Sequence, residues 1–569
     1  MAKNIAKHVN VNAGTPQSEK AREDQVLNNA GGYVFKTSEM EQLRRFLILG
    51  SSGGTYYVGE RKLTQDNAKN IVKLFNDAKT GIQAVQEIIR VSDEGIAPKN
   101  DPAIFALALA ASSSNSMVRN HALKNLDKVC RIGTHLFTFI TYVDEMRGWG
   151  KGLQKAIQRW YDNKGENLAF QVCKYPQRRV EGCLPWSHRD VLRKIHMKPS
   201  SLQMGQVFKY VVKGKDGFNG TEWDTLKTDK ALQYIWAHDK AKNATTTKEI
   251  VPLIKTYRLA RESVPNQLFG KEVFEALQPH MGMTALIRNL NRMTECGLLV
   301  PMGKVTNEVI DKLTDETLLA KERVHPFNIL VAQRQYMCGQ SRNLTWQAVP
   351  AIVDALEDAF YKSFQFVEPT GKRFLLGLDV SGSMGSQINS SNKPGNIYSC
   401  YSSQPGALSC AEAAAAMSMV TARTEKKSHV MGFADSFRDL GIRANDTLDQ
   451  VLRKTSSMNF GGTDCSLPMK WALKNNVEVD VFIVYTDNET WYDGGGYSWG
   501  GQTHNDEKHV FEALNQYRKK TGIDAKLVSV AMSPTNFSIV DPKDAGMLNV
   551  VGFDSSAPQI IHDFAADKI

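Results

Sequence analysis

Hydrophobic positions in the first two-thirds of the chain recur with the spacing of amphipathic helices. From about residue 25 to residue 365, short helical patterns are separated by breaks that contain glycine or proline. Leu153, Ile157 and Trp160, for example, fall on one face of a single helix. Many short helices with short connections predict a stacked all-α helical-repeat array of the solenoid type. A small β element is expected at two places within it, residues 31–35 and 54–58.

The pattern changes near Pro369. Residues 374–378 form a continuous apolar run, which is typical of a strand buried on both faces. Helical and strand patterns then alternate to the end of the chain, and this alternation predicts a doubly wound, largely parallel α/β sheet. The expected protein is therefore multidomain, with a flexible polar tail (residues 1–22), a helical-repeat module (23–368) and an α/β domain (369–569).

The formal net charge of +10 is concentrated in the helical module. Residues 1–368 hold 51 basic and 38 acidic side chains, whereas residues 369–569 hold 19 and 22. Within the module, residues 151–213 carry 13 basic and 4 acidic side chains. So large a local excess predicts a polyanion-binding site, and a merely solvated basic face is the alternative.

Composition narrows the class of protein. With 42% hydrophobic and 23% charged residues, the 569-residue chain has the make-up of a globular protein. No apolar run approaches the roughly 18–20 residues that span a membrane, and the polar N-terminus is unlike a secretory signal. The eight cysteines form no CxxC pair and are expected to be reduced thiols of an intracellular protein. A zinc site is disfavoured because the spacings match no common ligand pair; its ligands would be Cys173, Cys183, His188 and His196.

Polar segments follow the predicted strands of the α/β domain. Residues 379–383 (DVSGS) come directly after the first strand, and residues 486–489 (TDNE) follow the strand at 480–485. Residues 461–464 (GGTD) lie between them in the sequence, just before a helix. In a parallel sheet all three segments meet at one edge. Carboxylate and hydroxyl oxygens are the ligands that Mg²⁺ prefers, so the sequence predicts a divalent-cation site there.

This combination resembles the metal-ion-dependent adhesion site of von Willebrand factor A domains. The resemblance implies that Ser381, Ser383 and Thr463 are direct or near-direct ligands and that Asp379 and Asp487 bind the ion directly or through water. A decayed site, in which these residues only cap loops, is the alternative. The sequence departs from the compact pattern in a polar insertion, residues 386–405, which could cover the metal, and the loop at 491–501 could act as a lid.

The basic segment combines cations with aromatic rings. Lys151, Lys155 and Arg159 recur every four residues and share one helix face. Cations for phosphates and flat rings for stacking are what RNA binding requires, although composition does not distinguish RNA from DNA. A second helix repeats the pattern with Arg189, Arg193 and His196, and the intervening loop contributes Lys174, Arg178, Arg179, Trp186 and His188.

Several sequence runs resemble the family of the 60-kDa Ro autoantigen, in which a TROVE module precedes a von Willebrand factor A domain. These runs are residues 131–140, 186–190, 197–201, 367–376, 461–468 and 482–490, and the resemblance extends from about residue 32 to residue 569. It implies a ring of HEAT-like repeats closed by the A domain, with Y-type noncoding RNA on the outer basic surface and single-stranded 3′ ends of misfolded RNA in the ring.

The same resemblance assigns individual residues. The Trp186-Ser187-His188 motif places His188 in the RNA site, and its basic companions would be Lys174, Arg178, Arg189 and Arg193. For the ring channel the candidates are Arg44, Arg288, Arg292 and His325, for each of which a structural ion pair is an equal alternative.

We therefore expect a non-enzymatic, monomeric RNA-binding protein of a small ribonucleoprotein, acting in RNA stabilisation and quality control. Its expected location is the cytoplasm, with the nucleus left open. The alternative is a metal-dependent protein-adhesion scaffold whose A domain binds a partner's carboxylate. A Mg²⁺ nuclease is disfavoured, because the sequence has no P-loop, HExxH, GxSxG or dense carboxylate cluster.

Overall fold

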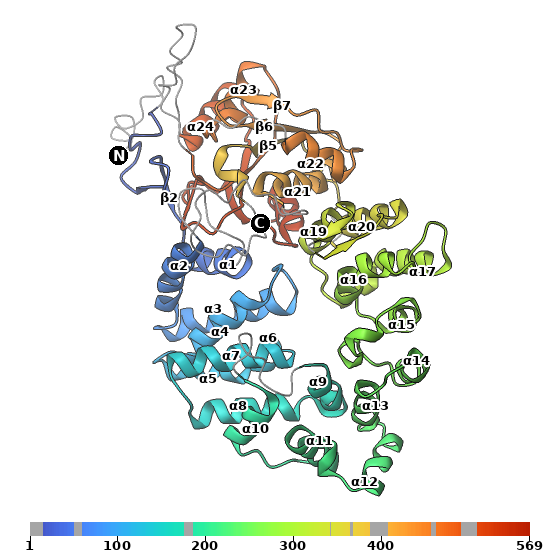
Figure 1. Ribbon diagram of the computed structural model, residues 1–569. Coiled ribbons are helices and arrows are strands. Elements are labelled where there is room, and N and C mark those ends of the chain that lie inside the picture. The colour runs from blue at the N-terminus through green and yellow to red at the C-terminus, as the bar shows by residue number, and fades with distance from the viewer. Residues whose placement is uncertain are drawn as a thin grey trace.

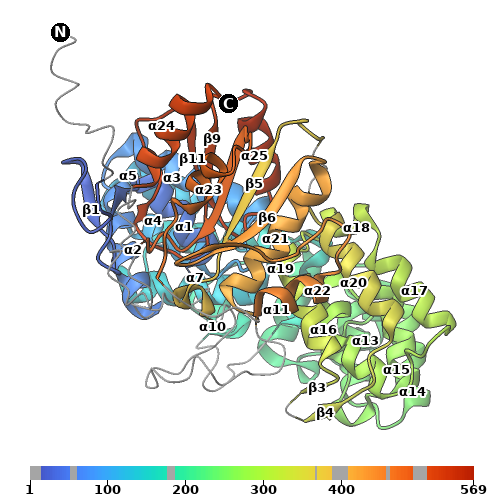
Figure 2. The ribbon, with the colours of Figure 1, turned by 90° about the horizontal axis from the view of Figure 1, so that it is seen from above.

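Helices follow one another in two arms, and a C-terminal α/β domain lies between the first and the last of them (Figure 1). Seen from above, the helices from α13 (Gln233–Lys242) to α17 (Lys304–Leu313) extend away from that domain (Figure 2). None of the helices that the structure describes is long and apolar enough to cross a membrane. The computed structural model describes residues 15–50, 60–175, 186–341, 343–364, 368–386, 408–456, 462–490 and 509–569.

The first arm of the ring descends from the α/β domain (Figure 1). Its helices are held by apolar stripes of the predicted kind, as in α8, where Leu153, Ile157 and Trp160 are buried. The arm consists of α1 (Glu39–Leu49), α2 (Glu60–Leu74), α3 (Ala78–Asp93), α4 (Asp101–Ser112), α5 (Ser116–Lys124), α6 (Leu126–Val129), α7 (Gly133–Met146), α8 (Lys151–Asp162), α9 (Leu168–Lys174) and α10 (His188–Ile195).

The second arm returns to the α/β domain on the other side of the molecule (Figure 1). It consists of α11 (Leu202–Lys213), α12 (Gly220–Thr225), α13 (Gln233–Lys242), α14 (Thr247–Tyr257), α15 (Lys271–Leu277), α16 (Met283–Glu295), α17 (Lys304–Leu313), α18 (Glu316–Lys321), α19 (Pro326–Met337), the hairpin β3 (Gln340–Ser341) and β4 (Leu344–Thr345), and α20 (Pro350–Lys362).

The α/β domain has a six-stranded sheet in the order β11-β9-β8-β5-β6-β7, parallel except for the edge strand β7. The predicted doubly wound fold is therefore confirmed, and the short antiparallel edge strand β7 is an addition to the sheet that was not expected. Its elements are β5 (Phe374–Asp379), α21 (Cys410–Thr424), β6 (Ser428–Phe433), β7 (Phe437–Asp439), α22 (Leu448–Ser456), α23 (Leu467–Lys474), β8 (Val481–Thr486), α24 (Val510–Thr521), β9 (Lys526–Ala531), β10 (Phe537–Ser538), β11 (Met547–Val551) and α25 (Ala557–Ala565).

Alternate residues of the central strands pack into two different cores. Leu375 and Phe482 lie with α23 and α24 in one apolar cluster. Leu376 and Ile483 lie with α21, α22 and α25 in another, which continues without a break into the helical ring. One face of the sheet is thus part of the same core as the ring, so the A domain is built into the ring rather than tethered to it.

The two arms also meet directly. His325, which begins α19, is 3% exposed, and its Nε2–H donates to the carbonyls of Ile96 (2.9 Å) and Phe553 (2.6 Å). Arg323 pairs with Asp93 across the same seam at 2.8 Å. The expectation that His325 lines an RNA channel is therefore wrong. Burial lowers the pKa of His325 to about 4, so its imidazole is neutral. The imidazole connects the first arm, the second arm and the A domain.

The N-terminal segment packs on the A domain. A hairpin of β1 (Gln25–Leu27) and β2 (Tyr33–Lys36) pairs antiparallel with β10. The polar residues 15–22 were expected to belong to a flexible tail, which is wrong because Thr15, Gln17 and Arg22 bind side chains of the A domain; Gln17 is 1% exposed. The strand expected near 31–35 is present, whereas residues 1–14 and 54–58 lie outside the described residues.

Helix α1 is anchored to the A domain by a buried arginine. The Arg45 side chain is 1% exposed, and its guanidinium donates to the Thr535 carbonyl (2.6 Å) and to Asn549 Oδ1 (3.0 Å) as well as to the Phe537 carbonyl. Burial lowers the pKa of Arg45 to about 10. At the other end of the ring, Arg423 of α21 lies 3.7 Å from the ring centre of Tyr361 in α20.

Candidate nucleic-acid interface and candidate metal centre

Two neighbouring helices, α8 and α10, carry the predicted basic residues (Figure 1). On α8, the apolar stripe is buried and Lys151, Lys155 and Arg159 are exposed on the opposite side. Arg159 also donates to the Leu123 carbonyl at 3.1 Å, so part of its guanidinium is committed to the protein. The two lysines are the cations of α8 that are best placed for an external anion.

Helix α10 has the same two-sided design. Its buried stripe falls at i, i+3, i+4 and i+7, whereas Arg193 and the neighbouring Lys194 are exposed and Arg189 is half-buried. His196 is exposed and ends the helix in the left-handed region, with φ of 49°. The buried stripe consists of His188, Val191, Leu192 and Ile195.

His188 belongs to that buried stripe. The expectation that it contacts RNA is wrong for this structure, because its side chain has no exposed surface. The imidazole packs against Phe137 (ring centres 4.8 Å apart), and its Nδ1 lies 2.8 Å from Tyr161 Oη. Burial lowers the pKa of His188 to about 3, so the ring is neutral. The residue positions α10 against α7 and α8.

A cluster of aromatic rings adjoins the basic residues. Trp149, directly before α8, and Trp186, directly before α10, have ring centres 5.4 Å apart, and Lys194 Nζ lies 5.6 Å from the Trp149 ring. Both tryptophans are half-buried. Trp149 and Lys194 were not among the predicted site residues. The sequence could have indicated Trp149, because this aromatic residue lies between two glycines at the start of the basic helix.

The remaining predicted residues are only partly described. Lys174, at the end of α9, is half-buried, and its Nζ lies 5.2 Å from the centre of the Phe170 ring. Arg178, Arg179 and Cys183 lie outside the described residues. Within the part of the chain that the structure describes, no three His, Cys, Asp or Glu side chains converge as metal ligands.

A cavity of about 330 Å³ lies between α9, α11 and residues 229–231. Its lining includes three carboxylates, from Asp162, Glu166 and Asp229, and one cation, Lys230. Carboxylates repel phosphates, so the cavity is not an extension of the basic surface. Among the channel candidates, Arg44 pairs with Glu87 at 2.7 Å, whereas Arg288 and Arg292 are exposed on α16.

The three polar segments of the A domain meet at one edge of the sheet, as predicted. Asp379 ends β5, and Asp487 follows its parallel neighbour β8. Ser381 N donates to Asp379 Oδ1 at 3.0 Å, and the hydroxyls of Ser381 and Ser383 lie 3.0 Å apart. Thr463 is 4% exposed, and the next residue is hydrogen-bonded to the chain just beyond β6.

The electrostatics of this edge favour a cation. Asp379 and Asp487 are 0% and 2% exposed. Burial, reinforced by the charge of Asp487, raises the pKa of Asp379 to about 7, and burial also raises the pKa of Asp487. Asp487 Oδ2 is buried without a hydrogen-bond partner among the described residues. Two buried carboxylates, adjacent hydroxyls and a free carboxylate oxygen fit a hard divalent cation.

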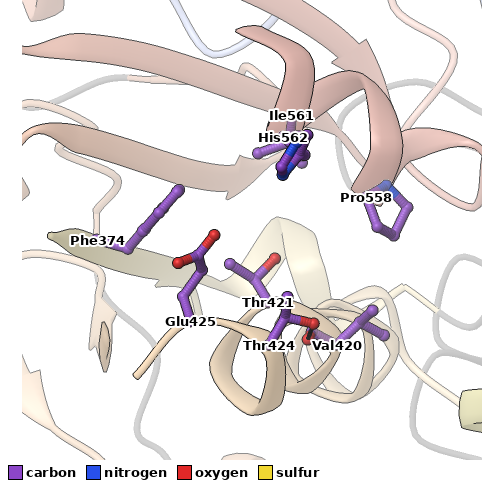
Figure 3. Close-up of a pocket in the computed structure, with 8 residues that line it drawn as sticks. All are labelled: Phe374, Val420, Thr421, Thr424, Glu425, Pro558, Ile561 and His562. Carbon is purple, nitrogen blue, oxygen red and sulfur yellow. Dashed lines mark hydrogen bonds between the residues drawn. The ribbon is translucent and has the colours of Figure 1, made fainter. Parts of the chain in front are cut away.

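Other features of the A domain offer less to a ligand. The predicted cover and lid, residues 387–405 and 491–501, lie outside the described residues. A cavity between α21 and α25 is lined by Phe374, Glu425 and His562 among others (Figure 3). Its volume is about 20 Å³, which holds a single water molecule and excludes an organic ligand.

The fold and the two sites define a class of protein: a TROVE-type helical ring completed by a von Willebrand factor A domain. The TROVE domain model matches residues 26–338, and the Ro60 vWA domain model matches residues 373–565. The chain belongs to the Ro60 family.

Relatives match over nearly the whole chain. One from Caenorhabditis elegans is 37% identical over 97% of this chain and 92% of its own length, and one from Deinococcus radiodurans is 38% identical over the full length of both; each is named RNA-binding protein RO60. The crystal structure of the Deinococcus radiodurans RO (RSR) protein matches with a TM-score of 0.66 at 38% identity, covering 94% of this chain and 100% of that one.

Proposed function

We propose that this protein binds RNA without acting as an enzyme, and that the surface formed by α8 and α10 holds a small structured noncoding RNA of the Y type. The observation that carries the proposal is that two neighbouring helices of a Ro60-family ring, α8 and α10, both carry exposed cations and are both preceded by a half-buried tryptophan. Cations bind the phosphate backbone, and an indole ring can stack on an unpaired base. The exposed cations are Lys151, Lys155, Arg193 and Lys194.

In the same proposal, single-stranded 3′ ends of misfolded RNA enter the ring, and the exposed cations Arg288 and Arg292 of α16 are the candidates to bind them. The protein would act in RNA stabilisation and quality control, as a monomer, in the cytoplasm. Arg44 contributes less, because its guanidinium already pairs with Glu87.

The A domain would hold Mg²⁺ at the strand edge through Asp379, Ser381, Ser383, Thr463 and Asp487, for a structural role or for a protein ligand. The unpartnered Oδ2 of buried Asp487 supports this assignment. When bound, the ion would neutralise the two carboxylates and accept an oxygen ligand from outside.

The RNA assignment is tested by replacing Lys155, Arg193 and Lys194 with alanine and measuring affinity for a hairpin RNA at about 150 mM salt. At about 1 kcal/mol for each lost phosphate contact, affinity should fall about a hundredfold. The matched control removes three exposed lysines of α13 and α14, Lys242, Lys248 and Lys255, and should leave affinity unchanged. Equal affinities in the two triple variants would contradict the assignment.

A further inference from the structure

Residues 15–32 cross the edge of the A domain where the two loops that carry Thr463 and Asp487 meet. Gln17 bridges these loops with one amide group. Its Nε2 donates to Asp464 Oδ1 at 2.7 Å, and Thr490 Oγ1 donates to its Oε1 at 2.8 Å. With 1% of its surface exposed, Gln17 makes these contacts away from competing water.

Asn28 makes a second connection. Its Nδ2 donates to the carbonyls of Thr490 (2.8 Å) and Asn488 (3.3 Å), and its Oδ1 accepts from Gly32 N (2.8 Å). The backbone at Gly32 passes so close that a Cβ would lie 2.0 Å from the Thr490 carbonyl oxygen. Only glycine allows this approach.

Asn29 clamps the same loop through a carboxylate. Its backbone N and its Nδ2 donate to the two oxygens of Glu489 at 2.9 and 2.7 Å. Glu489 is 0% exposed, so the backbone of the loop next to Asp487 is fixed from outside the A domain.

These contacts matter because the predicted ligands lie on loops. Thr463 is followed by Asp464, which Gln17 holds, and Asp487 is followed by Asn488, whose carbonyl Asn28 holds. Metal sites require ligand positions within about 0.5 Å, and removing the groups that hold metal ligands in place typically lowers metal affinity 10–100-fold.

We propose that residues 15–32 are a positioning element of the cation site: Gln17 and Asn28 set the distance between the Thr463 and Asp487 loops, so that cation binding and docking of this segment are coupled. The inference rests on the proposed cation site, and it goes beyond it by assigning part of that site to the opposite end of the chain. Because coupling is reciprocal, a bound cation stabilises the docked segment by as much as the segment strengthens cation binding.

The segment also connects the site to the ring. It continues through β2 into α1. There Arg45 donates hydrogen bonds to Thr535, to Phe537 of β10 and to Asn549 of β11. The first helix of the RNA-binding module and the strand edge are therefore held by one continuous stretch of chain.

The test uses the full-length protein and Mn²⁺ as the titrated ion, followed by calorimetry. In the Gln17→Ala/Asn28→Ala variant, Mn²⁺ affinity should fall at least about tenfold. The matched control, Ser18→Ala/Glu23→Ala, changes two exposed residues of the same segment and should bind Mn²⁺ like wild type. Hydrogen exchange of residues 15–32 should slow when Mn²⁺ is added to wild type and should not slow in Ser381→Ala.

Hairpin-RNA affinity is measured on the same proteins to separate this inference from the RNA function. If the double variant loses Mn²⁺ affinity but binds RNA as wild type does, the inference is supported. It is also supported if the double variant loses Mn²⁺ affinity and neither protein binds RNA. Unchanged Mn²⁺ affinity in the double variant, absence of Mn²⁺ binding by wild type, or a parallel loss of RNA and Mn²⁺ binding would each overturn it.

Discussion

The chain gathers ionisable side chains in two regions under opposite physical conditions. On the α8–α10 surface, cations such as Lys155 and Arg193 are exposed to water above a buried apolar stripe. At the edge of the A domain, Asp379 and Asp487 are withdrawn from water, which raises the pKa of both carboxyl groups, and the charge of Asp487 raises the pKa of Asp379 further. An exposed charge is stable without a partner, whereas a buried charge is costly unless it is neutralised. The basic surface is therefore complete without a ligand, and the acidic edge requires a proton or a cation.

The largest effect is expected where the basic surface depends on a buried group. His188→Ala should lower the free energy of unfolding by about 3 kcal/mol, because it leaves a cavity among aromatic rings and removes the partner of Tyr161 Oη. RNA affinity should fall with it. Urea denaturation provides the measurement, and His196→Asn, an exposed histidine in the left-handed conformation, is the control. A His188→Ala protein with wild-type stability would contradict the buried role.

At the acidic edge, removing an ionisable side chain should raise the stability of the fold instead of lowering it. In EDTA, Asp487→Asn should raise the free energy of unfolding by about 1–2 kcal/mol, because the amide removes the repulsion with Asp379. The variant should also lose any stabilisation by Mg²⁺. Thermal melts with EDTA and with Mg²⁺ compare the two states. If Asp487→Asn melts lower than wild type in EDTA, the edge does not require a cation.

The two regions should show opposite pH dependence. His188 has a folded pKa of about 3 against an ordinary 6.5, so its stability contribution is present above pH 6.5 and is lost as pH falls. Asp379 has a folded pKa of about 7 against an ordinary 3.8, so without metal its contribution is present below pH 3.8 and is lost as pH rises toward 7. Between its folded and its ordinary pKa, each group changes the free energy of unfolding by about 1.4 kcal/mol per pH unit.

Because these slopes oppose each other between pH 4 and 6.5, single variants reveal them. In EDTA, His188→Gln should reduce the loss of stability on acidification, and Asp379→Asn should reduce the loss on raising the pH. Unfolding free energies at half-unit pH intervals provide the measurement. If the unfolding free energies of wild type and both variants depended on pH in the same way, the two regions would not differ in their electrostatics as described.

The smallest stability effect is expected on the basic surface itself. Lys155→Ala and Arg193→Ala should each change the unfolding free energy by less than about 0.5 kcal/mol, because both side chains are exposed. Their effect should appear in RNA affinity alone. A large loss of stability in either variant would show that these cations support the fold.

Much of the architecture could be predicted from the sequence because local periodicity determines it. The change from helical patterns to alternating strands and helices marks the A domain, and α20 ends at Lys362 while β5 begins at Phe374, on either side of the expected boundary. The antiparallel β7, Phe437–Asp439, is too short to produce a recognisable pattern.

The errors concern side chains whose setting depends on distant parts of the chain. His188 follows a tryptophan and a serine in a basic segment, yet its spacing to Val191 and Ile195 already placed it on the buried stripe. No comparable signal marks Gln17. It is a polar residue in a polar segment, and its partners Asp464 and Thr490 lie more than 440 positions away.

We propose that RNA binds the ring through exposed charge, independently of the A-domain edge. The most direct test is equilibrium binding of wild type to a hairpin RNA with and without a single-stranded 3′ tail, over a series of monovalent salt concentrations, with Mg²⁺ or EDTA. We predict tight binding that weakens steeply with salt, improves with the tail and does not change with EDTA. Weak binding that is indifferent to salt and tail, or binding that EDTA abolishes, would show that exposed charge on the ring does not hold the RNA.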